Sequence, residues 1–82
     1  MTTILIVNGP NLDMLGKRDP HHYGTTTLKE LEARLLERAD VLDVELDFVQ
    51  SNTEGELVTF INKSSSDANG IIINPAGLTT VG

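Results

Sequence analysis

Two short runs of uninterrupted apolar residues constrain the fold of this chain more than any other feature. Residues 4–7 read Ile-Leu-Ile-Val, residues 71–73 are three isoleucines, and each run is followed at once by asparagine and then glycine or proline. A short apolar run that ends at turn-forming residues is typical of a strand covered on both faces, as in a parallel sheet. The two runs therefore predict two interior strands of an α/β domain.

Two amphipathic helices are expected between these strands. Apolar residues recur at helical spacing over residues 28–42, and Thr27 with Glu30 predicts a capping box at the start of this helix. Thr53 is the expected N-cap of a second helix, with Glu56 three residues later. The inner face of the second helix is expected to carry Leu57, Phe60, Ile61 and Ser64.

A third strand is expected over residues 44–49, where apolar and acidic side chains alternate. Alternation is typical of a strand with one solvent-exposed face, so this strand is expected at an edge of the sheet. The element order β-α-β-α-β and right-handed crossovers then predict strand order 2-1-3, with the helices on opposite faces. This is a flavodoxin-like three-layer α/β sandwich, whose ligands bind at the carboxyl ends of strands one and three.

The outer side of the last strand is left without a neighbour within these 82 residues. An uncovered apolar edge strand invites pairing with another chain. Residues 1–82 are therefore expected to form a single, apparently truncated flavodoxin-like domain. Either a partner fills the open place, or the sequence is part of a longer protein.

Composition excludes several classes of function. There are 12 acidic and 6 basic residues, a balance that opposes binding to nucleic acid and to anionic membranes. No apolar run is long enough to span a membrane, and the N-terminus does not read as a signal peptide. The chain has no cysteine, which excludes a disulfide scaffold and is compatible with the expected cytoplasmic location.

Carboxamide side chains follow all three expected strands. Asn8 and Asn11 follow the first, residues 50–52 (Gln-Ser-Asn) follow the second, and Asn74 follows the third. Parallel strands end at the same edge of a sheet, so these groups are expected at the ligand crevice. The competing interpretation is local, because asparagine is a good turn residue and residues 51–53 also suit a helix start.

A basic segment lies in the long loop between the first strand and the first helix. Arg18 and Tyr23 both fall in it, and a guanidinium near a phenol lowers the pKa of the tyrosine, which suits a general base. The alternative is an ordinary packed aromatic beside a surface charge, and spacing does not separate the two. His21 and His22 carry little weight as metal ligands, because adjacent side chains diverge and no third ligand is near.

Five segments taken together resemble the type II 3-dehydroquinate dehydratases of the shikimate and quinate pathways. In this sequence they read IVNGPNL at 6–12, LGKRDP at 15–20, YG at 23–24, QSNTEGEL at 50–57 and GIIINP at 70–75. Each segment alone is weak evidence, but together they cover nearly the whole chain in register.

The resemblance implies a hydro-lyase that converts 3-dehydroquinate to 3-dehydroshikimate without a metal or cofactor. It implies that Tyr23 is the proton acceptor, that Arg18 stabilises the tyrosinate and the charged transition state, and that Asn11 holds a water at the enolate oxygen. Asn74 would bind substrate. It also implies a homo-oligomer, a dodecamer in the full-length family.

The sequence departs from the family in two respects. Thr80 stands where the family has a histidine, and family members are roughly twice as long, with their acid and carboxylate-binding groups in the second half. The 82 residues alone are therefore expected to have little or no dehydratase activity. The alternatives are a non-catalytic truncated remnant or binding module, and one half of a split enzyme.

Overall fold

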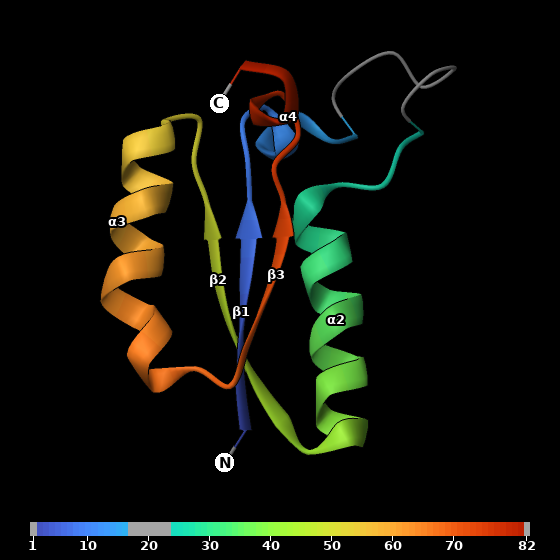
Figure 1. Ribbon diagram of the computed structural model, residues 1–82. Coiled ribbons are helices and arrows are strands. Elements are labelled where there is room, and N and C mark those ends of the chain that lie inside the picture. Colours follow the sequence, from blue (N-terminus) through green and yellow to red (C-terminus); the bar gives the residue numbers. More distant parts are fainter. Residues whose placement is uncertain (1, 17–23, 82) are drawn as a thin grey trace.

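The computed structural model describes residues 2–16 and 24–81. Strands and helices alternate along the chain, and two 3-10 turns and a short terminal helix complete the fold (Figure 1). In chain order the elements are β1 (Thr2–Asn8), η1 (Leu12–Met14), α2 (Leu28–Leu42), β2 (Val44–Gln50), α3 (Glu54–Ser64), η2 (Ser65–Asp67), β3 (Gly70–Asn74) and α4 (Leu78–Val81).

The three strands form one parallel sheet in the order β2-β1-β3. Ile4 is in register with Leu46 on one side and with Gly70 on the other, so β1 is the central strand. This confirms the strand order 2-1-3 expected from the exposed face of the second strand. It also brings the carboxyl ends of all three strands to one edge of the sheet, as Figure 1 shows.

The two long helices cover opposite faces of the sheet (Figure 1). Leu5, Val7 and Leu57 form the core on the α3 face, where partly buried Phe60 and Ile61 pack against them. On the α2 face, Ile6 and Ala39 are buried and a narrow apolar groove runs between the helix and the strands. The result is the predicted three-layer sandwich, with one apolar layer on each side of β1.

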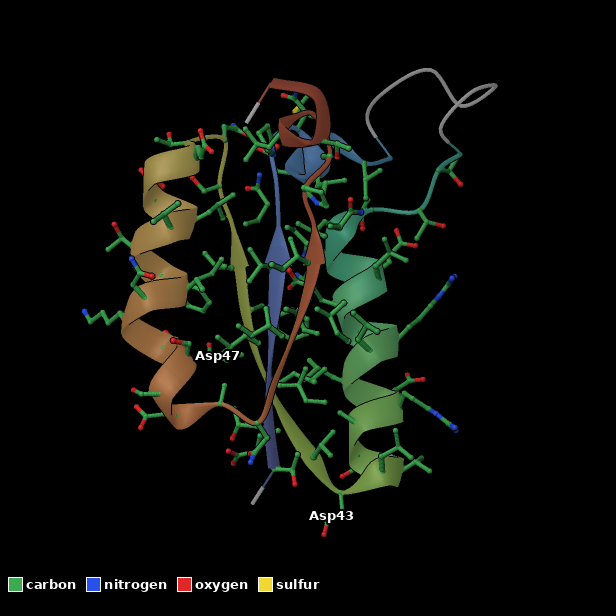
Figure 2. The ribbon with its side chains drawn as sticks, in the orientation of Figure 1. Asp43 and Asp47 are labelled. Atoms are coloured by element: carbon green, nitrogen blue, oxygen red, sulfur yellow. The ribbon has the colours of Figure 1, made fainter. Side chains whose placement is uncertain are left out.

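Exposed acidic and half-buried apolar side chains alternate along β2, as expected for a strand at the edge of the sheet. Glu45 and Asp47 are exposed, whereas Val44 and Leu46 are half-buried on the α2 side. Figure 2 shows Asp47 on the α3 side of the sheet and Asp43 at the turn between α2 and β2. Asp43 adopts a left-handed conformation (φ 59°) at the C-cap of α2, a conformation that aspartate tolerates better than most residues.

The start of α2 is capped as the sequence predicts. The Thr27 hydroxyl accepts the backbone N–H of Glu30 at 3.1 Å and donates to the Glu30 carboxylate at 3.2 Å. The start of α3 differs from the prediction, because the Thr53 side chain makes no cap hydrogen bond. Instead, the Ser51 hydroxyl forms hydrogen bonds with groups at this helix start.

The Ser51 hydroxyl is buried, accepts the backbone N–H of Thr53 at 3.0 Å and donates to the Glu56 carboxylate at 2.7 Å. The physical reason is that Ser51 leaves β2 pointing toward the first turn of α3, close enough to bond both groups. Ser51 therefore ties the N-cap residue to the side chain of Glu56, although this is not a cap hydrogen bond because the Thr53 N–H precedes the helix.

The prediction that β3 is covered on both faces is wrong for the described residues. Ile71, Ile72 and Ile73 are 39%, 57% and 51% exposed, although Ile72 is in register with Ile6, which is 5% exposed. Both long helices contact β2, which lies at the opposite edge of the sheet from β3. Neighbouring leucines of α2 that face the same side are also exposed, at Leu31, Leu35 and Leu42.

Among residues 2–16 and 24–81, none of the helices has the length and apolar character needed to cross a membrane.

Candidate active site

Three carboxamide side chains form a row across the carboxyl end of the sheet. Asn8 is in register with Gln50 on one side and with Asn74 on the other. Residues in register on parallel strands share a face, and Asn8 lines a hollow of about 230 Å³ against α2, so the row lies on the α2 face. The structure thus brings together the amides that the sequence places at three separate strand ends.

The exits of β1 and β3 are in direct contact. The Gly9 backbone N–H donates to the Asn74 carbonyl at 2.8 Å. A Cβ atom at Gly9 would stand 2.7 Å from the Pro75 carbonyl carbon, so only glycine allows this approach. The glycine after the first strand therefore allows the two strand exits to lie in contact.

The exit of β2 is bonded to the loop that follows β1. Gln50 Nε2 donates to the Gly9 carbonyl and to Asn52 Oδ1, both at 3.2 Å. Asn52 Oδ1 also accepts the backbone N–H of Asn11 at 2.8 Å. Asn11 is exposed and left-handed (φ 66°, ψ 1°), and its side chain makes no cap hydrogen bond to η1. The predicted water-holding residue is thus presented at the rim by partners from another strand.

Asn74, the predicted substrate-binding residue, also shapes its own turn. Its Oδ1 accepts the backbone N–H of Ala76 at 3.3 Å, and the Pro75 carbonyl accepts the N–H of Leu78 at 3.0 Å. The carboxamide is exposed, so its NH₂ group is accessible to a ligand while its oxygen serves the turn.

Arg18 and Tyr23, the predicted base and its partner, lie outside the described residues, as do His21 and His22. The described residues on either side of this segment meet. A Cβ atom at Gly16 would be 2.7 Å from the Thr25 carbonyl oxygen, and Gly16 and Gly24 both have positive φ. Gly16 and Thr25, which flank this segment, are therefore in close contact. In the part of the chain that the structure describes, no three potential metal ligands lie together.

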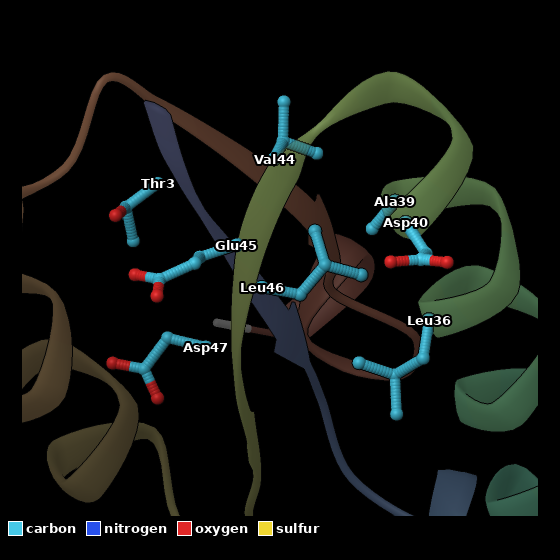
Figure 3. A pocket seen from close by; sticks show the side chains of 8 residues that line it. All are labelled: Thr3, Leu36, Ala39, Asp40, Val44, Glu45, Leu46 and Asp47. Carbon is cyan, nitrogen blue, oxygen red and sulfur yellow. The ribbon is translucent and has the colours of Figure 1, made fainter. Parts of the chain in front are cut away.

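The opposite end of the sheet holds a second hollow, of about 450 Å³, at the start of β2 (Figure 3). Figure 3 shows β2 passing through it, with Glu45 and Asp47 on one side of the strand and Leu36 and Asp40 on the other. The space is therefore the open flank of an edge strand and not a single concave site. Three carboxylates and no basic side chain line it, so it is poorly suited to an anionic ligand.

Comparison with known proteins identifies the family. Residues 2–82 match the family model described as "Dehydroquinase class II". The chain belongs to the class II dehydroquinase family. The 3-dehydroquinate dehydratase of Roseiflexus castenholzii is 53% identical over 79 residues, which are 96% of this chain and 50% of that protein. "Catabolic 3-dehydroquinase 1" of Fusarium vanettenii is 49% identical over 77 residues, 94% of this chain and 54% of that protein.

Solved structures agree with this family and with the expected flavodoxin-like fold. The crystal structure of type II dehydroquinase from Butyrivibrio crossotus superimposes with a TM-score of 0.88 at 34% identity, covering 95% of this chain and 55% of that one. The chain spans about half the length of the relatives that it matches.

The sequence favours a helix start as the main role of residues 50–52, and it does not show that two of them also bond the loop after β1. Ser51 does serve the start of α3, but Gln50 and Asn52 hold the β1 loop. The sequence does contain a signal for these contacts, because two carboxamide side chains, separated by one residue, stand at the end of a strand. That signal identifies groups at the rim but does not say which loop they bond.

Proposed function

We propose that residues 1–82 are the base-carrying half of one flavodoxin-like type II 3-dehydroquinate dehydratase domain, which converts 3-dehydroquinate to 3-dehydroshikimate and water. The observation that carries the proposal is the row of Asn8, Gln50 and Asn74 at the strand ends of a chain in this family. A crevice lined by neutral amides suits a polyhydroxylated substrate, because amides both donate to and accept from hydroxyl and carbonyl groups.

Each step up to formation of the enolate has a named residue in this chain. Tyr23, as tyrosinate, takes the proton from C2 beside the ketone, and the electron pair moves onto the ketone oxygen. Arg18 keeps the phenol ionised and stabilises the negative charge. Asn11 holds a water that donates to the enolate oxygen, and the Asn74 amide donates to the substrate. The enolate then expels the hydroxyl, which leaves as water after protonation.

The proton for the leaving hydroxyl comes from outside this half. The resemblance places the acid histidine of the family in the second half of the chain. Thr80 stands where the family has a different histidine, shortly after the third strand. In this proposal the enzyme is cytoplasmic and works without metal or cofactor. It assembles from copies of its own chain, as a dodecamer when the second half is present.

Complementation tests the proposal directly. The 82-residue chain is assayed with 3-dehydroquinate alone, and again mixed with the separately produced second half of the Roseiflexus castenholzii relative. We expect little or no turnover by the chain alone and measurable formation of the conjugated product by the mixture. Tyr23→Phe should reduce that turnover by about 100-fold or more, as expected for loss of a general base. Association of the two halves without turnover would refute the proposal.

Hydrogen exchange at the substrate isolates the base step. In deuterated buffer the 82-residue chain should catalyse exchange of the C2 proton of 3-dehydroquinate above the uncatalysed rate, without dehydration, and Tyr23→Phe should abolish this. Arg18→Gln should weaken it, since the phenol then stays protonated. Lys63→Gln, on the last turn of α3, is the matched removal of a cation away from the rim.

The alternative is a module that binds substrate without turning it over, and Thr80 at the histidine position favours it. Binding of 3-dehydroquinate, measured by calorimetry, without C2 exchange and without turnover in the complemented mixture would support this alternative.

A further inference from the structure

The carboxamide of Asn52 bonds two different parts of the chain through one oxygen atom. Asn52 Oδ1 accepts the backbone N–H of Asn11 at 2.8 Å and Gln50 Nε2 at 3.2 Å. A carboxamide oxygen has two lone pairs, so these two bonds satisfy it. Gln50 Nε2 donates in addition to the Gly9 carbonyl, two residues before Asn11. Gln50 and Asn52, called here the amide clamp, thus hold both ends of the Gly9–Asn11 turn.

Asn11 needs such support because of its backbone conformation. Its φ of 66° and ψ of 1° lie in the left-handed region, which asparagine tolerates but which extended or helical backbone would normally outcompete. The Asn11 carbonyl accepts the N–H of Met14 at 2.9 Å, so one side of the residue is fixed by η1. Asn52 fixes the other side. With both backbone polar groups bonded, the Cα–Cβ direction of Asn11 is fixed, and the exposed carboxamide extends from that point within its allowed rotamers.

We propose that Asn52, supported by Gln50, is a positioning residue for Asn11 in the dehydration, an inference that rests on the proposed function above. It acts through the backbone of Asn11 and does not touch the substrate. The water at the enolate oxygen is held by a side chain whose placement depends on the exit of β2. A displacement of that side chain weakens stabilisation of the enolate more than it weakens substrate binding.

A purely structural role makes a different prediction. If the amide clamp only fastens a loop, its loss lowers stability without a selective effect on turnover. Two substitutions at the same position separate these cases. Asn52→Asp keeps an acceptor oxygen for Asn11 and Gln50, whereas Asn52→Leu has similar shape and no acceptor. Asn62→Leu, on an exposed position of α3, is the matched control for the added apolar side chain.

The first measurement is hydrogen exchange of backbone amides by NMR in the 82-residue chain. Asn52→Leu should speed exchange of the Asn11 amide by about tenfold or more, the factor that corresponds to loss of a hydrogen bond worth roughly 1.4 kcal/mol. Asn52→Asp should leave it close to wild type. The Gly9 amide, which donates to Asn74, is the internal control and should stay protected in both variants. An unchanged Asn11 rate in Asn52→Leu would overturn the inference without reference to activity.

The second measurement is steady-state kinetics of the complemented enzyme with 3-dehydroquinate. Asn52→Leu should lower kcat by about 10- to 100-fold with KM changed less than about threefold, and Asn52→Asp should restore most of the loss. Faster Asn11 exchange with unchanged kcat would overturn the positioning role and leave the proposed function standing. Absence of turnover in the wild-type mixture would refute the proposed function, and the catalytic role of the amide clamp with it.

Discussion

Gly9 and Pro75 meet where β1 and β3 end, at a distance that admits no side chain on Gly9. A Cβ atom there would stand 2.7 Å from the Pro75 carbonyl carbon, shorter than real Cβ contacts. The same two exits are joined by the 2.8 Å bond from the Gly9 N–H to the Asn74 carbonyl. The two strand exits therefore meet in a backbone-to-backbone contact that leaves no room for a methyl group on Gly9.

Gly9→Ala should lower the free energy of unfolding by about 2 kcal/mol, because overpacking forces the two strand exits apart. Gly55→Ala is the control. Gly55 lies in the first turn of α3 with nothing within 4 Å of its would-be Cβ, so alanine there should be neutral or stabilising by up to about 1 kcal/mol. Urea denaturation followed by circular dichroism measures both. Equal effects of the two substitutions would contradict the close contact.

Ser51→Ala should destabilise the chain by about 2 kcal/mol, since the buried hydroxyl bonds both the Thr53 N–H and the Glu56 carboxylate. Thr53→Ala should cost less than about 0.5 kcal/mol, because its side chain makes no cap bond. Thr27→Ala, which removes the true cap of α2, should fall between them at about 1 kcal/mol. The same denaturation assay ranks the three variants, and a larger loss at Thr53 than at Ser51 would reverse the assignment.

Ile6→Val and Ile72→Val remove the same methylene from residues in register on adjacent strands. Ile6 is 5% exposed and Ile72 is 57% exposed, so Ile6→Val should cost about 1 kcal/mol and Ile72→Val less than half of that. When the second half of the Roseiflexus castenholzii relative is added, the cost of Ile72→Val should rise toward that of Ile6→Val. Thermal unfolding of each variant with and without this half gives the comparison; a cost at Ile72 that stays small in the complex would mean that β3 remains uncovered.

Asn74→Asp should separate the turn from the substrate contact. Aspartate keeps the oxygen that accepts the Ala76 N–H but has no NH₂ donor, so folding should change by less than about 0.5 kcal/mol. Turnover of the complemented enzyme should fall by about 10- to 100-fold if that donor binds substrate. Asn69→Asp is the matched control, because Asn69 Oδ1 accepts the Thr3 N–H at the other end of β3. Equal turnover in both variants would remove Asn74 from the site.

The order of the strands could be predicted because the pattern of apolar and polar side chains in each strand indicates which of its faces are buried. Residues 4–7 are apolar on both faces, and β1 is central; residues 44–49 alternate, and β2 is an edge strand. The isoleucines of β3 gave an equally clear signal, yet they are exposed in the described residues. A local pattern predicts that a strand is buried, but it does not identify the element that would cover it.

The amides of the candidate site were also visible in the sequence, but their partners were not. Asn11 and Asn52 are 41 residues apart, and no local rule connects them. The bond exists because parallel pairing of β1 and β2 in register brings Asn8 beside Gln50, and the two exits then run together.

The amino-acid sequence by itself determined the elements of this protein, their order in the sheet, the capped start of α2 and the edge at which polar groups gather. Periodicity, turn residues and strand burial are local properties, so they can be read along the chain. Only the tertiary structure decided that Gly9 must lack a side chain and that Asn52 holds Asn11. Each depends on which atoms meet across a strand register, and that distance is fixed by packing between segments far apart in the chain.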